Sequence, residues 1–137
     1  MHFQETANWI LDKSPHTGET KTQTRRPRKF NEISTLRHVA LNPAGEIVEV
    51  VHGDRLKWQV GKWYAIQPGR GKPAVGYFQL TRIRLEHVDG ISAADARAEG
   101  FSSVTEFFNI WRKLYPSTRY ATSECWVLEW EKVRKRK

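Results

Sequence analysis

Alternation of apolar and polar residues predicts a strand near the end of the chain. Between residues 125 and 133, large apolar side chains take every second position. A period of two places such side chains on one face of a strand. The large apolar set is Trp126, Leu128 and Trp130, and the residues between them are Val127, Glu129 and Glu131. We therefore expect this segment to be the closing strand of a sheet.

Several earlier segments also have strand character. The threonine-rich stretch after Gly18 favours an extended strand that stops at Pro27, because proline cannot donate a ladder hydrogen bond. Between residues 31 and 60 the pattern predicts a short hairpin with its turn near His52-Gly53-Asp54. The clearest signals are strands at residues 63–66 and 74–85, joined by the loop QPGRGKP.

Three helices are expected from apolar spacing and capping residues. Residues 3–13 carry apolar side chains at helical spacing. Ser92 can cap a short helix that ends at Gly100. Ser103 and Glu106 form a possible capping box for a third helix, whose apolar stripe is assigned to the core. The stripe comprises Val104, Phe107, Phe108, Trp111 and Leu114.

The order of these elements is typical of an α+β fold. A small curved sheet or open β-barrel with helices packed at one side suits the order. With 137 residues, the chain is expected to form a single domain spanning 1–137, in which residues 134–137 are a basic tail.

Charge narrows the range of partners. The chain has 23 Lys and Arg against 15 Asp and Glu, a net charge of +8, which favours anionic partners such as nucleic acids or nucleotides. Cys125 is the single cysteine and the five histidines lack metal-ligand spacing, so no disulfide and no cofactor is expected. The chain shows no signal-peptide pattern and no apolar run of membrane-spanning length, so we expect a cytoplasmic protein without a membrane partner.

Four stretches together resemble a known family. They are GETKTQTRR, VGKWYAIQPGRGKPAVGYFQLTRIRLEHV, DARAEGFSSVTEFFNIWRKLYP and CWVLEWEKV, in that order. In sequence and order they resemble the ASCH family, which belongs to the PUA-like superfamily of small β-barrels associated with RNA. The form with QPGRGKP is similar to ASCH proteins of bacteriophages and prophages. The resemblance covers most of the chain and implies a PUA-like barrel.

The resemblance also implies a chemistry. Small bacterial relatives hydrolyse N4-acetylcytidine to cytidine with a lysine, a threonine three residues later and a helical glutamate. By position, their Lys-x-x-Thr-x-Arg motif falls on Lys21, Thr24 and Arg26, and their glutamate falls on Glu99. The implied function is therefore an amidohydrolase that acts on N4-acylated cytosine nucleosides. The greater length of this chain and its QPGRGKP loop depart from those relatives.

Each of these residues has a chemical role in such a reaction. Thr24 would attack the acyl carbonyl, and Lys21 would accept the hydroxyl proton once burial had lowered its pKa. Arg26 would bind the developing oxyanion. Glu99 would share a proton with Lys21. Strand alternation places Lys21 on the face opposite Thr24, so the mechanism requires a turn or bulge between them.

Four further residues are candidates for substrate binding. Arg25 would contact an anionic partner beside the cleft. Tyr64, Trp63 and Tyr77 are either core residues or, for one of them, a ring that would stack on a pyrimidine. Arg70 and Lys72 lie in the QPGRGKP loop, which lacks the spacing of a P-loop but suits phosphate contact or a simple solvated connection.

The sequence is also compatible with two other functions. An RNA-binding module without catalysis would use the same basic cleft, and the net charge favours it. A ribonuclease is less favoured because no histidine pair suggests its acid and base. Lys21, Thr24 and Glu99 also have ordinary interpretations as an exposed cation, a strand former and a solvated carboxylate. The substrate is a free nucleoside or RNA, and the sequence fixes neither the acyl group nor the oligomeric state.

Overall fold

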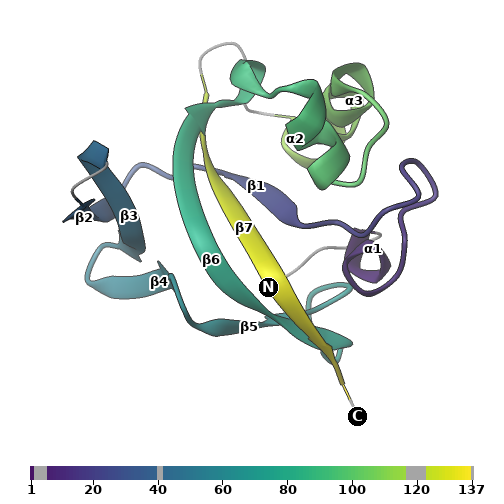
Figure 1. Cartoon of the computed structure of the whole chain (residues 1–137), viewed down its shortest axis with the longest axis horizontal. Coiled ribbons are helices and arrows are strands. Elements are labelled where there is room, and N and C mark those ends of the chain that lie inside the picture. Colours follow the sequence, from purple (N-terminus) through teal and green to yellow (C-terminus); the bar gives the residue numbers. More distant parts are fainter. Residues whose placement is uncertain (2–5, 40–41, 117–122, 137) are drawn as a thin grey trace.

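Seven strands form one antiparallel sheet across the middle of the molecule (Figure 1). The computed structural model describes residues 1, 6–39, 42–116 and 123–136. The strand order is β1-β7-β6-β3-β2, with β4 paired to β3 and β5 to β6. The strands are β1 (Gln23–Pro27), β2 (Glu32–Val39), β3 (Asn42–His52), β4 (Arg55–Gln59), β5 (Trp63–Ile66), β6 (Gly76–His87) and β7 (Glu124–Lys135). Within the described residues β1 and β2 do not pair, so the sheet is not closed into a barrel.

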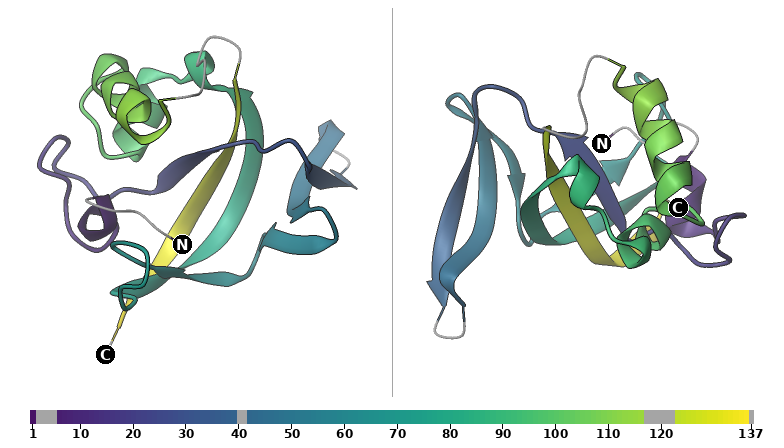
Figure 2. Two further views of the ribbon diagram at one scale, coloured as in Figure 1. Left: turned by 180° about the vertical axis from the view of Figure 1, so that it is seen from behind. Right: turned by 90° about the horizontal axis from the view of Figure 1, so that it is seen from above.

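The helices gather on one side of this sheet, and the β2–β3–β4 hairpins extend on the other (Figures 1 and 2). They are α1 (Ala7–Leu11), the 3₁₀ turn η2 (Val88–Gly90), α2 (Ala93–Ala98) and α3 (Val104–Leu114). The predicted α+β class is therefore confirmed. Residues 3–5 of the helix expected at 3–13 lie outside the described residues. No described helix is long and apolar enough to cross a membrane.

Local capping signals fix the starts of α2 and α3. Ser92 Oγ accepts a hydrogen bond from the Asp95 amide, and Ser103 Oγ accepts one from the Glu106 amide, both at 3.1 Å. These bonds satisfy amides at the first turns that have no partner inside the helix. Both predicted N-caps are confirmed, although the Glu106 carboxylate accepts from the Ser102 amide instead of closing the box on Ser103.

The core lies on both faces of β7. Trp126, Leu128 and Trp130 pack on one face with residues of β5 and β6, while Cys125 and Val127 pack on the other with α2 and α3. The alternation predicted from the sequence is confirmed. The helices explain why consecutive residues are buried here, since both faces of the strand are covered. β7 also continues through Lys135, two residues into the segment expected to be a basic tail.

Residues 31–60, for which the sequence pattern was least informative, form a three-stranded meander of β2, β3 and β4. The predicted turn is confirmed, since Gly53 has a φ of 64° between β3 and β4. β2, which pairs antiparallel with β3, was not predicted. Its apolar residues Ile33 and Leu36 are exposed, so they do not form the alternating buried pattern from which a strand is predicted.

A buried carboxylate ties this meander to the core. Glu32 is fully buried and accepts hydrogen bonds from the Lys29 amide at 2.7 Å, from Trp126 Nε1 at 3.0 Å and from Lys57 Nζ. Burial alone would raise the pKa of Glu32, but these hydrogen bonds and the Lys57 charge outweigh it and lower the pKa. Glu32 is therefore ionised and fully bonded at neutral pH.

We expect Glu32→Gln to lower the free energy of unfolding by about 2–4 kcal/mol, because it leaves buried donors with a poorer acceptor. Since the folded pKa is depressed, this stabilisation is present above the unfolded value of 4.5 and is lost as pH falls through the folded value. Urea unfolding of both proteins at pH 7 and pH 3 measures the effect. The difference should shrink at pH 3, and Glu49→Gln on β3 is the control. An unchanged stability at pH 7 would contradict the assignment.

Candidate active site

A cavity of about 380 Å³ lies where the start of β1 meets the helices. Lys21, Thr24, Arg25 and Arg26 contribute one wall, and Glu99 at the end of α2 contributes another. Trp9 and Thr6 close it from α1. The remaining lining comes from α3 and the segments beside it, namely Phe101, Phe107, Ile110, Trp111, Lys113, Leu114 and Tyr115. A mostly apolar cavity with a few convergent polar groups is the usual form of a small-molecule site.

Lys21 and Glu99 form a buried ion pair in this wall. Lys21 Nζ lies 3.1 Å from Glu99 Oε2, and the two residues are 4% and 3% exposed. Lys21 Nζ also donates to Thr6 Oγ1 at 3.4 Å. Glu99 Oε1 is buried and has no hydrogen-bond partner among the described residues. A buried pair with an unsatisfied oxygen is costly for folding, and such groups concentrate at functional sites.

Burial lowers the pKa of the Lys21 ammonium below its ordinary value of 10.5. The nearby Glu99 carboxylate opposes this shift, whereas the Arg26 guanidinium adds to it. Desolvation is the largest of these causes because the Lys21 side chain is almost entirely buried. A larger fraction of Lys21 is therefore neutral near neutral pH than of an exposed lysine. The predicted role of Lys21 as a base requires this neutral form.

The backbone before β1 brings Lys21 and Thr24 to the same cavity. β1 begins only at Gln23, so Lys21 precedes the regular strand. The Lys21 amide donates to the Trp9 carbonyl at 2.7 Å, and the Thr22 amide donates to Ala98 at 2.8 Å. Thr22 and Gln23 both line a hollow other than this cavity. This irregular entry supplies the break in alternation that the mechanism required.

Thr24 carries the candidate nucleophile. It is 4% exposed and lies in β1, where it pairs with Leu128 of β7. Its hydroxyl makes no hydrogen bond with Lys21 or Glu99 in the described structure. Contacts between nucleophile and base often tighten only when substrate binds.

The two arginines of the motif have different environments. Arg26 lines the cavity and is partly exposed, and its charge acts on Lys21. Arg25 also contributes to the wall, but its guanidinium is fully buried. Arg25 Nη2 lies 3.0 Å from Asp95 Oδ2 and 3.6 Å from Glu86 Oε2. A guanidinium engaged in this way holds α2 against the sheet, and it is not available to an external phosphate.

Three predicted binding residues lie elsewhere. Tyr64, Arg70 and Lys72 are not among the described residues that line the cavity. The Tyr64 hydroxyl accepts a hydrogen bond from the Gln59 amide at 2.7 Å, and its ring packs near Phe78. Arg70 and Lys72 are exposed in the loop between β5 and β6. The structure therefore gathers Lys21, Thr24, Arg26 and Glu99 and separates them from these three.

The sequence did not reveal the aromatic wall of the cavity. Phe107 and Trp111 were assigned to the core, and they are buried there, yet both also line the cavity. Trp9 and Tyr115 contribute further rings. A helical apolar stripe does not distinguish side chains that fill a core from side chains that border a cavity within it.

Other chemistries find little support in the described structure. Burial raises the pKa of the Cys125 thiol to about 11, so this cysteine is a poor nucleophile. Among the described residues, no three His, Cys, Asp or Glu side chains converge as metal ligands would.

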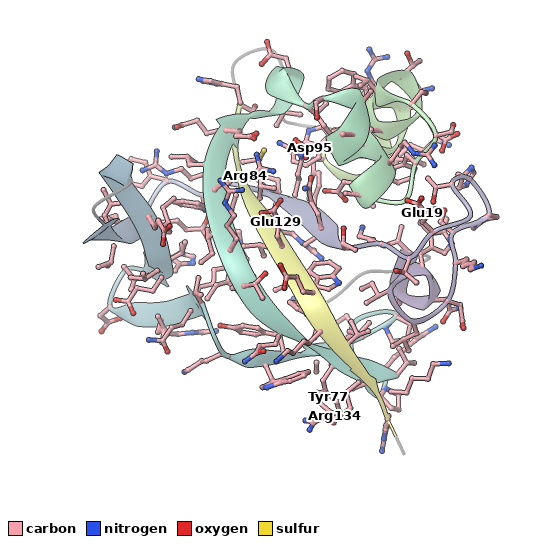
Figure 3. The ribbon with its side chains drawn as sticks, viewed as in Figure 1. Glu19, Tyr77, Arg84, Asp95, Glu129 and Arg134 are labelled. Atoms are coloured by element: carbon pink, nitrogen blue, oxygen red, sulfur yellow. The ribbon has the colours of Figure 1, made fainter. Side chains whose placement is uncertain are left out.

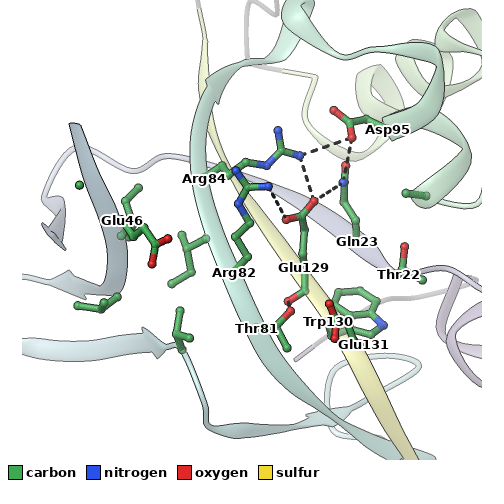
Figure 4. Close-up of a pocket in the computed structure, with 16 residues that line it drawn as sticks. Thr22, Gln23, Glu46, Thr81, Arg82, Arg84, Asp95, Glu129, Trp130 and Glu131 are labelled. Atoms are coloured by element: carbon green, nitrogen blue, oxygen red, sulfur yellow. Dashed lines mark hydrogen bonds and ion pairs between the residues drawn. The ribbon is translucent and has the colours of Figure 1, made fainter. Parts of the chain in front are cut away.

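A second hollow of about 940 Å³ is lined by residues of β3, β6 and β7, by the start of β1 and by α2 (Figure 4). Its charged groups are largely paired with one another. Arg84 Nη2 lies 3.2 Å from Glu129 and 3.5 Å from Asp95, and Gln23 Nε2 donates to both acids at 3.2 Å (Figures 3 and 4). This network connects α2 to β1, β6 and β7. Because Glu99 is the C-cap of α2, the network also fixes that residue in the cavity wall.

Comparison of the chain with protein-family models, with curated proteins and with solved structures found no match.

Proposed function

We propose that the chain is an amidohydrolase that removes the acyl group from N4-acylated cytosine nucleosides such as N4-acetylcytidine. The observation that carries this proposal is the buried Lys21–Glu99 pair, 3.1 Å apart, beside Thr24 in a cavity lined by aromatic rings. The resemblance to ASCH proteins supports the same chemistry, and a PUA-like fold and a cytoplasmic location are part of the proposal.

Acyl transfer to Thr24 is the first step. Neutral Lys21 accepts the hydroxyl proton as Thr24 Oγ attacks the acyl carbonyl carbon. Arg26 neutralises the negative charge that develops on the carbonyl oxygen. The C–N bond then breaks, and the exocyclic nitrogen leaves as the cytosine amine after it takes a proton from the Lys21–Glu99 pair.

Water completes the reaction. Neutral Lys21 takes a proton from a water molecule that attacks the acyl-threonine ester. The ester bond breaks, Thr24 regains its hydroxyl proton, and the carboxylic acid leaves. The sum is one amide bond and one water converted to cytidine and acetic acid, with the enzyme unchanged. Glu99 makes proton return possible because its carboxylate keeps the protonated lysine in place.

The cavity suits a single base in size and lining. Its volume of about 380 Å³ falls at the lower end of the range for ligand sites. Trp9, Phe107 and Trp111 supply flat apolar surfaces for a pyrimidine ring. We therefore favour the free nucleoside over an internal base of RNA.

The direct test is incubation of purified protein with N4-acetylcytidine, with cytidine release followed by chromatography. We expect release by the wild type and much slower release by Glu99→Gln. Glu19→Gln neutralises an exposed carboxylate in the loop before Lys21 and serves as the matched control (Figure 3). Absence of release by a correctly folded wild type would reject the proposal.

The pH dependence of the reaction reports on Lys21. Because the neutral amine is the base, kcat should rise with pH and level off above a pKa that lies below 10.5. The Glu99 charge raises that pKa, so the rising limb of the weaker Glu99→Gln activity should move to lower pH. Stopped assays between pH 5 and pH 10 measure the rising limb of kcat in the wild type and in Glu99→Gln. A limb at the same pH in both proteins would contradict the coupling of Lys21 to Glu99.

RNA binding without catalysis is the second candidate, and the net charge of +8 favours it. A ribonuclease is less well supported because no histidine is among the described residues that line the cavity.

A further inference from the structure

The outer face of β5, β6 and β7 carries aromatic and basic side chains in register. Trp63 pairs across the strands with Gln79, and Gln79 pairs with Lys132. In the next row, Ala65 pairs with Tyr77, and Tyr77 pairs with Arg134. Residues that alternate with these, such as Phe78 and Ile66, point into the core. We call the set Trp63, Tyr77, Gln79, Lys132 and Arg134 the basic aromatic face.

Arg134 organises the two rings of this face. Its guanidinium carbon lies 4.7 Å from the Trp63 ring centre and 5.8 Å from that of Tyr77. Arg134 is on β7 and Trp63 is on β5, so the Arg134 side chain reaches diagonally across β6. Trp63 is nonetheless 40% exposed, so much of its indole stays open to a ligand. Figure 3 shows Tyr77 and Arg134 together at the end of β6 and β7 remote from α2.

Positive charge surrounds the rings. Lys132 and Arg134 on β7 and Arg136 just after it recur at alternate positions, and all three are exposed. Lys62 immediately precedes β5, and Glu131 is the acidic residue next to Lys132 on β7. The β5–β6 loop, which carries Arg70 and Lys72, leaves the sheet at this same end, where Ile66 pairs with Gly76. This surface is therefore complementary to a polyanion.

We propose that the basic aromatic face binds single-stranded nucleic acid. A base would stack on the open part of Trp63, because every base offers a flat π surface. The adjoining phosphates would pair with Arg134, Lys132 and Lys62. An acidic protein would meet the same charges, but it would have no equivalent use for an exposed indole beside a guanidinium. A duplex hides its bases, so the single strand is the fitting form.

This face is separate from the active-site cavity. Trp63, Tyr77 and Arg134 are not among the described residues that line that cavity. The inference therefore stands without the proposed hydrolase. It also gives the exposed Arg70–Lys72 loop a phosphate-binding role on this surface instead of at the cavity.

The test is fluorescence anisotropy with a 5′-labelled RNA of twelve uridines, which contains no acylated cytosine and cannot report hydrolysis. Trp63→Ala should weaken binding about tenfold or more. Trp63→Phe should restore most of the affinity, and its circular dichroism melt shows that the fold is kept. Phe30→Ala is the matched control, because Phe30 is fully exposed in the loop after β1. It should change binding less than about twofold.

Charge is tested in the same assay as a function of salt. Arg134→Gln should weaken binding about five- to tenfold and reduce the slope of log K against log salt by about one. Arg55→Gln removes the same charge from exposed β4 and should have a smaller effect. A twelve-base-pair duplex should compete at least about tenfold less well than the single strand.

Three results would overturn the proposal. They are failure of the wild type to bind the RNA at 50 mM salt, equal weakening by Arg134→Gln and Arg55→Gln, and full affinity in Trp63→Ala. The first result would favour an acidic protein as the partner of this face. The second would show that RNA binding depends on net charge and not on this face. None of them bears on cytidine release, so the hydrolase proposal is judged separately.

Discussion

Thr24→Val is expected to lower kcat/KM for N4-acetylcytidine by about a thousandfold or more. The substitution keeps the shape of the buried side chain and removes only the hydroxyl that we propose attacks the acyl carbon. Loss of a nucleophile typically costs several orders of magnitude, while binding and charge stabilisation leave a small residual rate. Initial rates of cytidine release over a range of substrate concentrations measure the effect. KM should change little, because the base and its aromatic surroundings are untouched.

Thr22→Val is the control for this experiment. Thr22 is exposed and lies two residues earlier, and it does not face the active-site cavity. We expect wild-type kinetics from it.

Mass spectrometry of a quenched reaction should show an acyl group on the wild-type peptide that contains Thr24. If Thr24→Val kept its activity, Lys21 would have to activate water directly, and the covalent route would be excluded.

The second large effect concerns stability. We expect Lys21→Met to lower the free energy of unfolding by about 3–5 kcal/mol, because it leaves the Glu99 carboxylate buried without its cation. Glu99 is 3% exposed, and one of its oxygens already has no partner in the described structure. Denaturant unfolding at pH 7, followed by tryptophan fluorescence, measures the change.

Removing both charges should reverse this loss. Lys21→Met/Glu99→Leu fills the site with apolar side chains of similar volume, so we expect stability equal to or above the wild type by about 1–4 kcal/mol. The exposed pair Lys135–Asp12 provides the comparison, since Lys135→Met should cost less than about 1 kcal/mol. The double variant should be fully inactive. A double variant as unstable as Lys21→Met would show that the pair supports the fold instead of the chemistry.

Together these experiments separate two reasons for burying a lysine. Lys21 and Glu99 lie 78 residues apart in the chain and meet only in the cavity wall. A pair retained for stability would have all of its oxygens satisfied, as Glu32 does with Lys57, Lys29 and Trp126. The Lys21–Glu99 pair instead keeps one buried carboxylate oxygen without a partner in the described structure. That contrast between two buried glutamates is the physical basis for assigning one to the fold and the other to the reaction.

The sequence by itself determined most of the local structure. The N-caps Ser92 and Ser103, the strand at residues 63–66 and the alternation in β7 depend on neighbours a few positions apart, and each was predicted and confirmed. Backbone propensity and side-chain period act over such short ranges. β2 was not predicted, because it is held by pairing with β3 and its own exposed Ile33 and Leu36 give no inward pattern.

The resemblance likewise pointed to Lys21, Thr24, Arg26 and Glu99 as candidates, but only the tertiary structure decided their environment. Strand alternation had placed Lys21 away from Thr24, whereas the irregular entry into β1 puts both in one cavity. Arg25 and Arg26 are neighbours in the sequence and both border the cavity, yet the Arg25 guanidinium is fully buried against Asp95 whereas Arg26 is partly exposed. Burial and the distance between charges depend on segments that are remote in the chain. A local pattern can therefore nominate a catalytic lysine, but only the packing around it lowers its pKa.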